Sequence, residues 1–134
     1  MAKPAIDKLA WIEIQDRKVL VTRTRGKDAW YMPGGKRQGD ESDQAALLRE
    51  IQEELSVALD LRSLAHYGTF EGQAHGQPPG TIARLTCYTG TYKGTLSPSN
   101  EIEEINYAPY SMRPQIGRAG QLVFDNLKAK NLID

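Results

Sequence analysis

Residues 34–55 read GGKRQGDESDQAALLREIQEEL, a glycine pair followed by a polar loop and then by strong helix formers. Ser42 suits the position before a helix, where its hydroxyl can accept a backbone N–H. Asp43 suits the positively charged first turn. Residues 45–55 are mostly alanine, leucine and glutamate, which have high helix propensity. The stretch therefore predicts a helix over residues 43–55 behind a glycine-rich loop.

The predicted helix has an acidic side and an apolar side. At about 3.6 residues per turn, Glu50, Glu53 and Glu54 are related as i, i+3 and i+4 and lie together. The adjoining arc is apolar and wide enough to pack against a sheet. Its residues are Leu47, Leu48, Ile51 and Leu55. The apolar side thus packs the helix against the sheet, and the acidic side leaves its carboxylates available to a ligand.

Crowded carboxylates call for a compensating charge, because like charges at this spacing destabilise a helix by about 0.2 to 0.5 kcal/mol per pair. Mg²⁺ would supply it, since this hard cation is held by carboxylates together with water and phosphate. Gly34 and Gly35 allow unusual backbone angles, and Lys36 and the helix amino terminus attract anions. The pattern indicates adjoining metal and phosphate sites. The alternative is a solvated acidic surface on which Arg49 offsets Glu53.

The composition is that of one folded domain. The chain has 134 residues, 40% hydrophobic and 25% charged, and this length suits a single domain over residues 1–134. Seventeen lysines and arginines balance seventeen acidic residues, so no overall field favours a nucleic acid polymer or an anionic membrane. No apolar run approaches the ~18 residues of a membrane span, and no signal peptide is evident. A cytoplasmic protein without nucleic acid or membrane partners is expected.

The cysteine and the histidines indicate no second chemistry. Cys87 is the only cysteine and lies in the apolar run IARLTCYTG, so we expect a small buried residue without a disulfide. His66 and His75 lack a third ligand at zinc spacing. His75 is predicted to be a loop residue.

Turn signals divide the rest of the chain into short strands and a second helix. An opening hairpin is predicted from residues 9–14 and 18–23, followed by a short aromatic strand at residues 30–32. The later predictions are strands over residues 61–70 and 81–92 that form a longer hairpin, a strand over 104–107 and a helix over 117–132. Strands alternating with two helices predict an α/β (α+β) fold, with a mixed β-sheet packed between helices.

The loop and helix also resemble a known motif. The stretch that begins at Gly35 is similar to the Nudix box. Five residues separate Gly35 from Glu41, and seven separate Glu41 from the run REIQEELSV, which begins at Arg49. The pattern of that box is G, five residues, E, seven residues and REUxEExGU, where U is aliphatic. Every specified position matches except Ser56, where the family has glycine. For a residue other than glycine, a left-handed backbone conformation at position 56 costs ~1 kcal/mol or more. The geometry of this turn is therefore in question.

The resemblance extends beyond the box at residues 35–57. The WYMPGGK entry, the chain length and the acidic EIEEINY segment before a carboxyl-terminal helix are similar to the family as well. The resemblance implies a minimal, MutT-like member with the Nudix α/β/α sandwich over residues 1–134. It also implies Mg²⁺ as the cofactor, with Mn²⁺ as a substitute.

Site roles follow from the resemblance residue by residue. The implied metal ligands are Gly35, Glu50, Glu53 and Glu54. Glu41 and Arg49 are implied to hold the loop against the helix and to orient the other carboxylates. The base that accepts a proton from the attacking water is Glu53 in the first instance, with Glu50 as a further candidate.

Residues outside the box supply further candidates. Glu101 lies in a later acidic stretch from which some relatives draw the base. Its neighbours Glu103 and Glu104 could equally be the charged positions of an exposed edge strand, which hinder aggregation. Arg23 and Lys27, together with Lys36 of the glycine loop, are candidate ligands of substrate phosphates, although basic residues at strand ends are commonly only solvated.

Family members hydrolyse a diphosphate bond in a nucleoside diphosphate linked to another group. The resemblance thus implies a Mg²⁺-dependent pyrophosphohydrolase. A nucleoside triphosphate is the first candidate substrate, and we expect a monomer or homodimer. Nucleotide sugars, dinucleoside polyphosphates and non-nucleotide diphosphates stay open, because the box recognises only the diphosphate and the metal. A non-catalytic nucleotide-binding Nudix domain and an interaction module with a merely acidic surface are the alternatives of other classes.

Overall fold

The computed structural model describes residues 6–74 and 76–134, so the prediction for His75 lies outside the described residues. The strands are β1 (Ile6–Ile12), β2 (Ile14–Gln15), β3 (Lys18–Thr24), β4 (Gly34–Gly35), β5 (Ala58–Leu59), β6 (Ala65–Gln73), β7 (Ile82–Thr89), β8 (Tyr92–Lys93) and β9 (Ile102–Ala108). The α-helices are α1 (Asp43–Leu55) and α2 (Arg118–Ala129), and the 3₁₀ turns are η1 (Leu61–Ser63) and η2 (Tyr110–Gln115).

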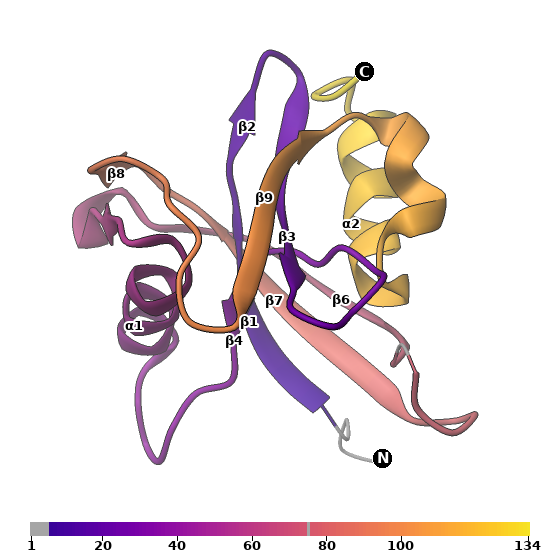
Figure 1. The fold of residues 1–134 in the computed structure, drawn as a ribbon, viewed down its shortest axis with the longest axis horizontal. Coiled ribbons are helices and arrows are strands. Elements are labelled where there is room, and N and C mark those ends of the chain that lie inside the picture. Colours follow the sequence, from indigo (N-terminus) through magenta and orange to yellow (C-terminus); the bar gives the residue numbers. More distant parts are fainter. Residues whose placement is uncertain (1–5, 75) are drawn as a thin grey trace.

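A mixed four-stranded sheet of order β4-β1-β7-β6 lies between the two α-helices (Figure 1). β1 and β7 run parallel, whereas β4 and β6 pair antiparallel with their neighbours. An antiparallel sheet of order β2-β3-β9 and a short β5-β8 pair complete the strands of the described residues. The predicted mixed sheet between helices is therefore confirmed, with the second sheet as an addition.

The predicted opening hairpin is only half right. Its turn is present at Asp16 and Arg17, whose φ angles are 50° and 63°, and it joins β2 to β3. β1, however, pairs in parallel with β7 along its whole length, from Ile6 opposite Ala83 onward. The alternation of apolar residues in a strand does not depend on which partner it takes, so the sequence could not reveal this choice.

Other boundaries also differ from the prediction. The stretch that begins at Leu61 starts as η1, because the Asp60 carboxylate accepts the Arg62 N–H at 3.1 Å and caps the turn. The hairpin of β6 with β7 is confirmed. The predicted strand over residues 81–92 is divided into β7 and β8.

The remaining segments are close to expectation. The predicted aromatic strand forms only isolated bridges, one of them between Tyr31 and Thr22. β9 is longer than predicted. The helix predicted over residues 117–132 begins after Gly117 and ends at Ala129.

Helix α1 matches its prediction residue for residue. The Ala45 N–H donates to the Ser42 hydroxyl at 3.1 Å, so Ser42 caps the helix. Ser56 ends it in the left-handed conformation, with φ 63° and ψ 23°, and donates its N–H to the Gln52 carbonyl at 3.1 Å. Serine thus retains the turn for which the box specifies glycine. In the described part of the chain, no helix is long and apolar enough to cross a membrane.

Two hydrophobic cores lie on opposite faces of the mixed sheet. One contains Leu47, Ile51 and Leu55 of α1 with Leu9 and Trp11 of β1. The other contains Val123, Phe124 and Leu127 of α2 with Ala10 and Ile12 of β1 and the fully buried Cys87. Successive residues of a strand point to opposite faces, so β1 contributes to both cores. The burial predicted for Cys87 and for the apolar side of α1 is confirmed.

Replacing Leu47 with alanine should loosen α1 from the sheet. Its side chain is fully buried, and a Leu→Ala change in a core lowers the free energy of unfolding by about 2 to 5 kcal/mol. Urea unfolding followed by circular dichroism measures this loss. Leu48→Ala is the matched control on the same helix, where the half-buried side chain should cost ~1 kcal/mol. Equal losses at the two positions would contradict the packing described.

Candidate active site

The glycine pair of β4 brings the loop into contact with both the sheet and helix α1. Leu9 pairs with Gly35, and Ala10 pairs with Gly34. Gly34 has φ 143°, and a Cβ there would lie 1.9 Å from the Leu9 carbonyl oxygen, so only glycine fits. A Cβ on Gly35 would lie 2.4 Å from the carboxyl carbon of Glu50. The absence of both side chains lets the backbone approach the carboxylates.

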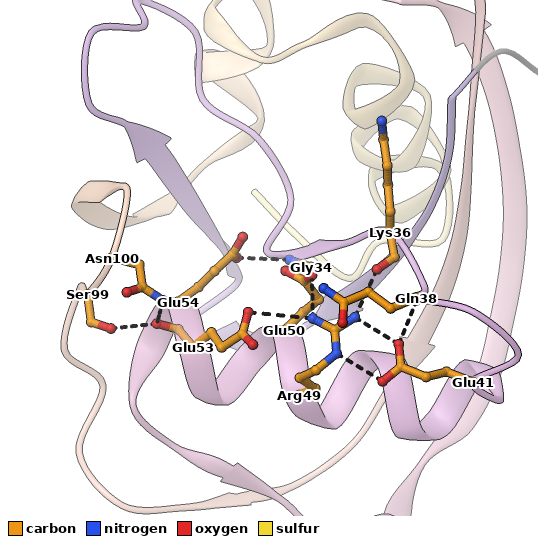
Figure 2. A network of polar contacts seen from close by, with 10 residues as sticks. All are labelled: Gly34, Lys36, Gln38, Glu41, Arg49, Glu50, Glu53, Glu54, Ser99 and Asn100. Carbon is orange, nitrogen blue, oxygen red and sulfur yellow. Dashed lines mark hydrogen bonds and ion pairs between the residues drawn. The ribbon is translucent and has the colours of Figure 1, made fainter.

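Arg49 ties the glycine loop to helix α1 (Figure 2). Its Nε and Nη2 donate to the two carboxylate oxygens of Glu41, each at 2.9 Å. Nη2 also donates to the Lys36 carbonyl oxygen at 3.0 Å, and Nη1 donates to Glu50 at 2.9 Å. The Arg49 guanidinium and the Gln38 N–H lower the pKa of Glu41 to about 2. The geometry fits the supporting role expected of Glu41 and Arg49, which stays a prediction.

Glu54 is a buried carboxylate whose charge has little compensation. Its exposed fraction is 7%, and one of its oxygens accepts the Gly34 N–H at 3.2 Å. Within the described residues it forms no ion pair. Burial raises the pKa of Glu54 to about 8, and repulsion from Glu50 and Glu101 acts in the same direction. The fold therefore keeps an acidic group where its charge is poorly compensated.

Glu50 and Glu53 lie beside Glu54 in different environments. Burial raises the pKa of Glu50, against the effect of its ion pair with Arg49. The Glu53 side chain is 47% exposed and points toward Arg49, 3.5 Å away, whereas Glu54 points toward Gly34 (Figure 2). Within residues 6–74 and 76–134, the side chains form no ready-made group of three metal ligands. Glu53 would have to turn away from Arg49 to join its neighbours around one ion.

The chemistry of this site fits a hard divalent cation. All its candidate donors are oxygens: the Gly35 carbonyl and the carboxylates of Glu50, Glu53 and Glu54. A cation would compensate the buried charge of Glu54. The space that a side chain on Gly35 would fill lies directly against Glu50.

A later loop is anchored on the end of helix α1. Ser99 donates its N–H to the Glu54 carbonyl oxygen at 2.9 Å, and its hydroxyl donates to the Glu53 carbonyl oxygen. Asn100 donates its side-chain N–H to that same Glu53 oxygen at 3.2 Å. The next residue, Glu101, consequently interacts electrostatically with Glu50 and Glu54. The structure thus places the candidate later-loop carboxylate, Glu101, near Glu50 and Glu54.

Arg23 lies where β3 meets β9. Its guanidinium forms ion pairs with Glu104 and with Glu103, the latter at 3.3 Å, and donates from Nη1 to the Lys27 carbonyl oxygen at 3.0 Å. Hydrogen bonding to Glu104 raises the pKa of Arg23. These contacts hold β3 to β9, and the phosphate contact expected of Arg23 stays a prediction. They also separate Glu103 and Glu104 from Glu101, which lies at the site.

A cavity of about 290 Å³ opens beside Glu54. Its charged and polar lining includes Lys8, Thr24, Lys27, Tyr31, Glu54 and Arg118. The predicted phosphate ligand Lys27 therefore lies at the cavity, whereas Lys36 is an exposed residue of the glycine loop. Sequence reasoning missed Lys8. The available signal was a lysine at an inward position of β1, two residues before the buried Ala10.

The raised pKa of Glu54 predicts how the metal-free protein responds to pH. Between about pH 4.5 and pH 8 the folded protein keeps the Glu54 proton and the unfolded chain does not, so the free energy of unfolding falls as pH rises. We expect this group to lower it by roughly 1 to 3 kcal/mol between pH 5 and pH 8. Glu41 acts in the opposite sense, but only below about pH 4.5, because its pKa is lowered.

Urea unfolding in EDTA at several pH values, for the wild type and Glu54→Gln, measures this contribution. The glutamine can still accept the Gly34 N–H, so the variant should lose the falling slope and be more stable at pH 8. Glu53→Gln is the matched control and should keep the wild-type slope. The same slope in wild type and Glu54→Gln would rule out Glu54 as its source.

Known proteins share both the sequence pattern and the fold of this chain. The family model of the NUDIX domain matches residues 8–120. A comparison with curated proteins found no match. The solution structure of the E. coli ORF135 protein is 24% identical over 96% of this chain and 94% of its own, with a TM-score of 0.72. The MutT NUDIX hydrolase from Burkholderia pseudomallei is 19% identical over 92% of this chain and 98% of its own, with a TM-score of 0.75.

A third structure agrees with these two. The MutT protein from Methanosarcina mazei Go1 is 17% identical over 98% of both chains, with a TM-score of 0.70. At this level of identity the likeness concerns the fold, whereas the family model covers most of the sequence, including the glycine loop and α1. The chain belongs to the Nudix family, as a MutT-like Nudix hydrolase.

Proposed function

We propose that this protein is a Mg²⁺-dependent pyrophosphohydrolase that cleaves a diphosphate bond in a small nucleotide. Nudix hydrolases in general use divalent metal ions and act on nucleoside diphosphate derivatives. The observation that carries the proposal is the buried Glu54 carboxylate, which forms no ion pair within the described residues, lies close to Glu50 and lines a cavity. A purely structural acidic surface would keep its carboxylates in solvent.

The proposed ligands of the ion are the Gly35 carbonyl and the carboxylates of Glu50, Glu53 and Glu54. When bound, Mg²⁺ supplies positive charge that stabilises phosphate oxygens in the transition state and lowers the pKa of a coordinated water. Arg49 keeps Glu50 oriented through its 2.9 Å contact, and Glu41 in turn fixes Arg49.

A base must take the proton of the attacking water. Glu53 is our first candidate, because it is the most exposed of the three helix carboxylates and a water can reach it. Glu101 is the second candidate, since the contacts of Ser99 and Asn100 with α1 hold its loop at the site. Glu50 is the third, although its ion pair with Arg49 occupies one of its oxygens.

The proposed substrate is a small nucleotide that contains a diphosphate bond. A nucleoside triphosphate is our first candidate, and a nucleotide sugar or a dinucleoside polyphosphate is the alternative. Mn²⁺ should substitute for Mg²⁺, because it accepts the same oxygen ligands. A cytoplasmic location and a monomeric or homodimeric state stay predictions.

Product release from a panel of nucleoside triphosphates, nucleotide sugars and dinucleoside polyphosphates, with and without Mg²⁺, tests the proposal. We expect metal-dependent turnover that falls by about 10² to 10⁴-fold in Glu53→Gln, the range typical of a lost general base. Glu71→Gln removes an exposed carboxylate of β6 and is the matched control. Turnover that does not depend on metal, or no turnover across the panel, would refute the proposed reaction.

A further inference from the structure

Lys8 carries its charge into the cavity from the edge of the α2 core. Along β1, Lys8, Ala10 and Ile12 point to the same face of the sheet, and the latter two are buried in the core that contains α2. The stem of Lys8 therefore continues an apolar stripe, and its half-buried side chain lines the cavity together with Glu54.

The ammonium group of Lys8 lacks a direct partner of opposite charge. In the described part of the chain it forms no ion pair. Its Nζ lies over the Tyr31 ring, 6.0 Å from the ring centroid. It is attracted electrostatically by Glu54 and Glu50 and repelled by Lys36. Lys8 and Lys36 thus both place positive charge near the proposed metal ligands.

The other cations near the site differ from Lys8 in this respect. Arg23 is paired with Glu103 and Glu104, and Arg49 with Glu41 and Glu50. Lys27 and Arg118 line the cavity but are exposed, so solvent satisfies their charges. Lys8 is the half-buried cation whose charge an incoming anion would compensate.

From this geometry we propose that Lys8 binds a phosphate group of the substrate on the cavity side of Glu54. This inference rests on the proposed function. It adds Lys8 as a phosphate ligand and specifies where the substrate extends from the proposed metal site. The substrate extends from the carboxylates of α1 into the cavity, with a phosphate oxygen against the Lys8 ammonium. Charge-assisted hydrogen bonds of this kind are short and strong.

Calorimetric titration of methylenediphosphonate, a diphosphate that cannot be hydrolysed, tests the contact in the presence of Mg²⁺. Lys8→Met keeps the apolar stem and removes the charge, and should weaken binding by about 10-fold or more. Lys8→Arg keeps the charge and should retain most of the affinity. Lys18→Met removes an exposed lysine of β3 and should leave binding unchanged.

A second titration uses the α,β-methylene analogue of a nucleoside triphosphate. Weakening of both ligands in Lys8→Met would place Lys8 on the diphosphate itself, and weakening of the nucleotide analogue alone would place it on the additional phosphate. Affinities within twofold of the wild type for both ligands would overturn the proposal, as would a wild type that binds neither. Thermal unfolding shows that each variant is folded, and Lys8→Gln replaces Lys8→Met if that variant is not.

Turnover is measured separately, so that the two proposals fail separately. Binding that depends on Lys8 without any turnover would refute hydrolysis and leave the phosphate contact standing. Turnover with an unchanged KM in Lys8→Met would refute the phosphate contact and leave hydrolysis standing.

Discussion

The burial of the Glu54 carboxylate is the constraint around which the site is arranged. A carboxylate removed from water is strongly destabilising unless hydrogen bonds or opposite charge compensate it. Here the compensation comes from the Gly34 N–H, which is in place because β4 pairs with β1, and from the electrostatic attraction of Lys8. The raised pKa of Glu54 is the electrostatic consequence. Burying this group without an ion pair in the described residues costs stability, which a bound cation would restore.

The two sides of the sheet contribute differently to that site. The core beneath α1 fixes the helix, so the positions of Glu50, Glu53 and Glu54 follow from the packing of Leu47, Ile51 and Leu55. The core beneath α2 ends at the cavity, where Lys8 follows the stripe of Ala10 and Ile12. β1 belongs to both cores, and through Leu9 it also holds the glycine pair. One strand therefore relates the carboxylates to the cavity beside them.

Local signals in the sequence were sufficient for the helix and its caps. Helix propensity, the Ser42 hydroxyl and the spacing of the glutamates act within a few residues, and the structure agrees with each of them. The pairing of β1 with β7, the ion pairs of Arg23 and the contacts of Ser99 and Asn100 with α1 join residues far apart in the chain. Periodicity contains no information about such partners. For the same reason the sequence did not single out Lys8, which lies one residue before the strand predicted over residues 9–14.

The central claim is that the carboxylates of α1 form a divalent metal site with Glu54 as a ligand. Electron paramagnetic resonance of Mn²⁺ measures binding directly, because free Mn²⁺ gives the sharp signal and bound Mn²⁺ does not. Titrations of the wild type and of Glu54→Gln at pH 8 should show one site in the wild type and at least about 10-fold weaker binding in the variant, as expected when a metal-ligating charge is lost. Equal Mn²⁺ affinity in the two proteins, or no binding to the wild type, would contradict the claim.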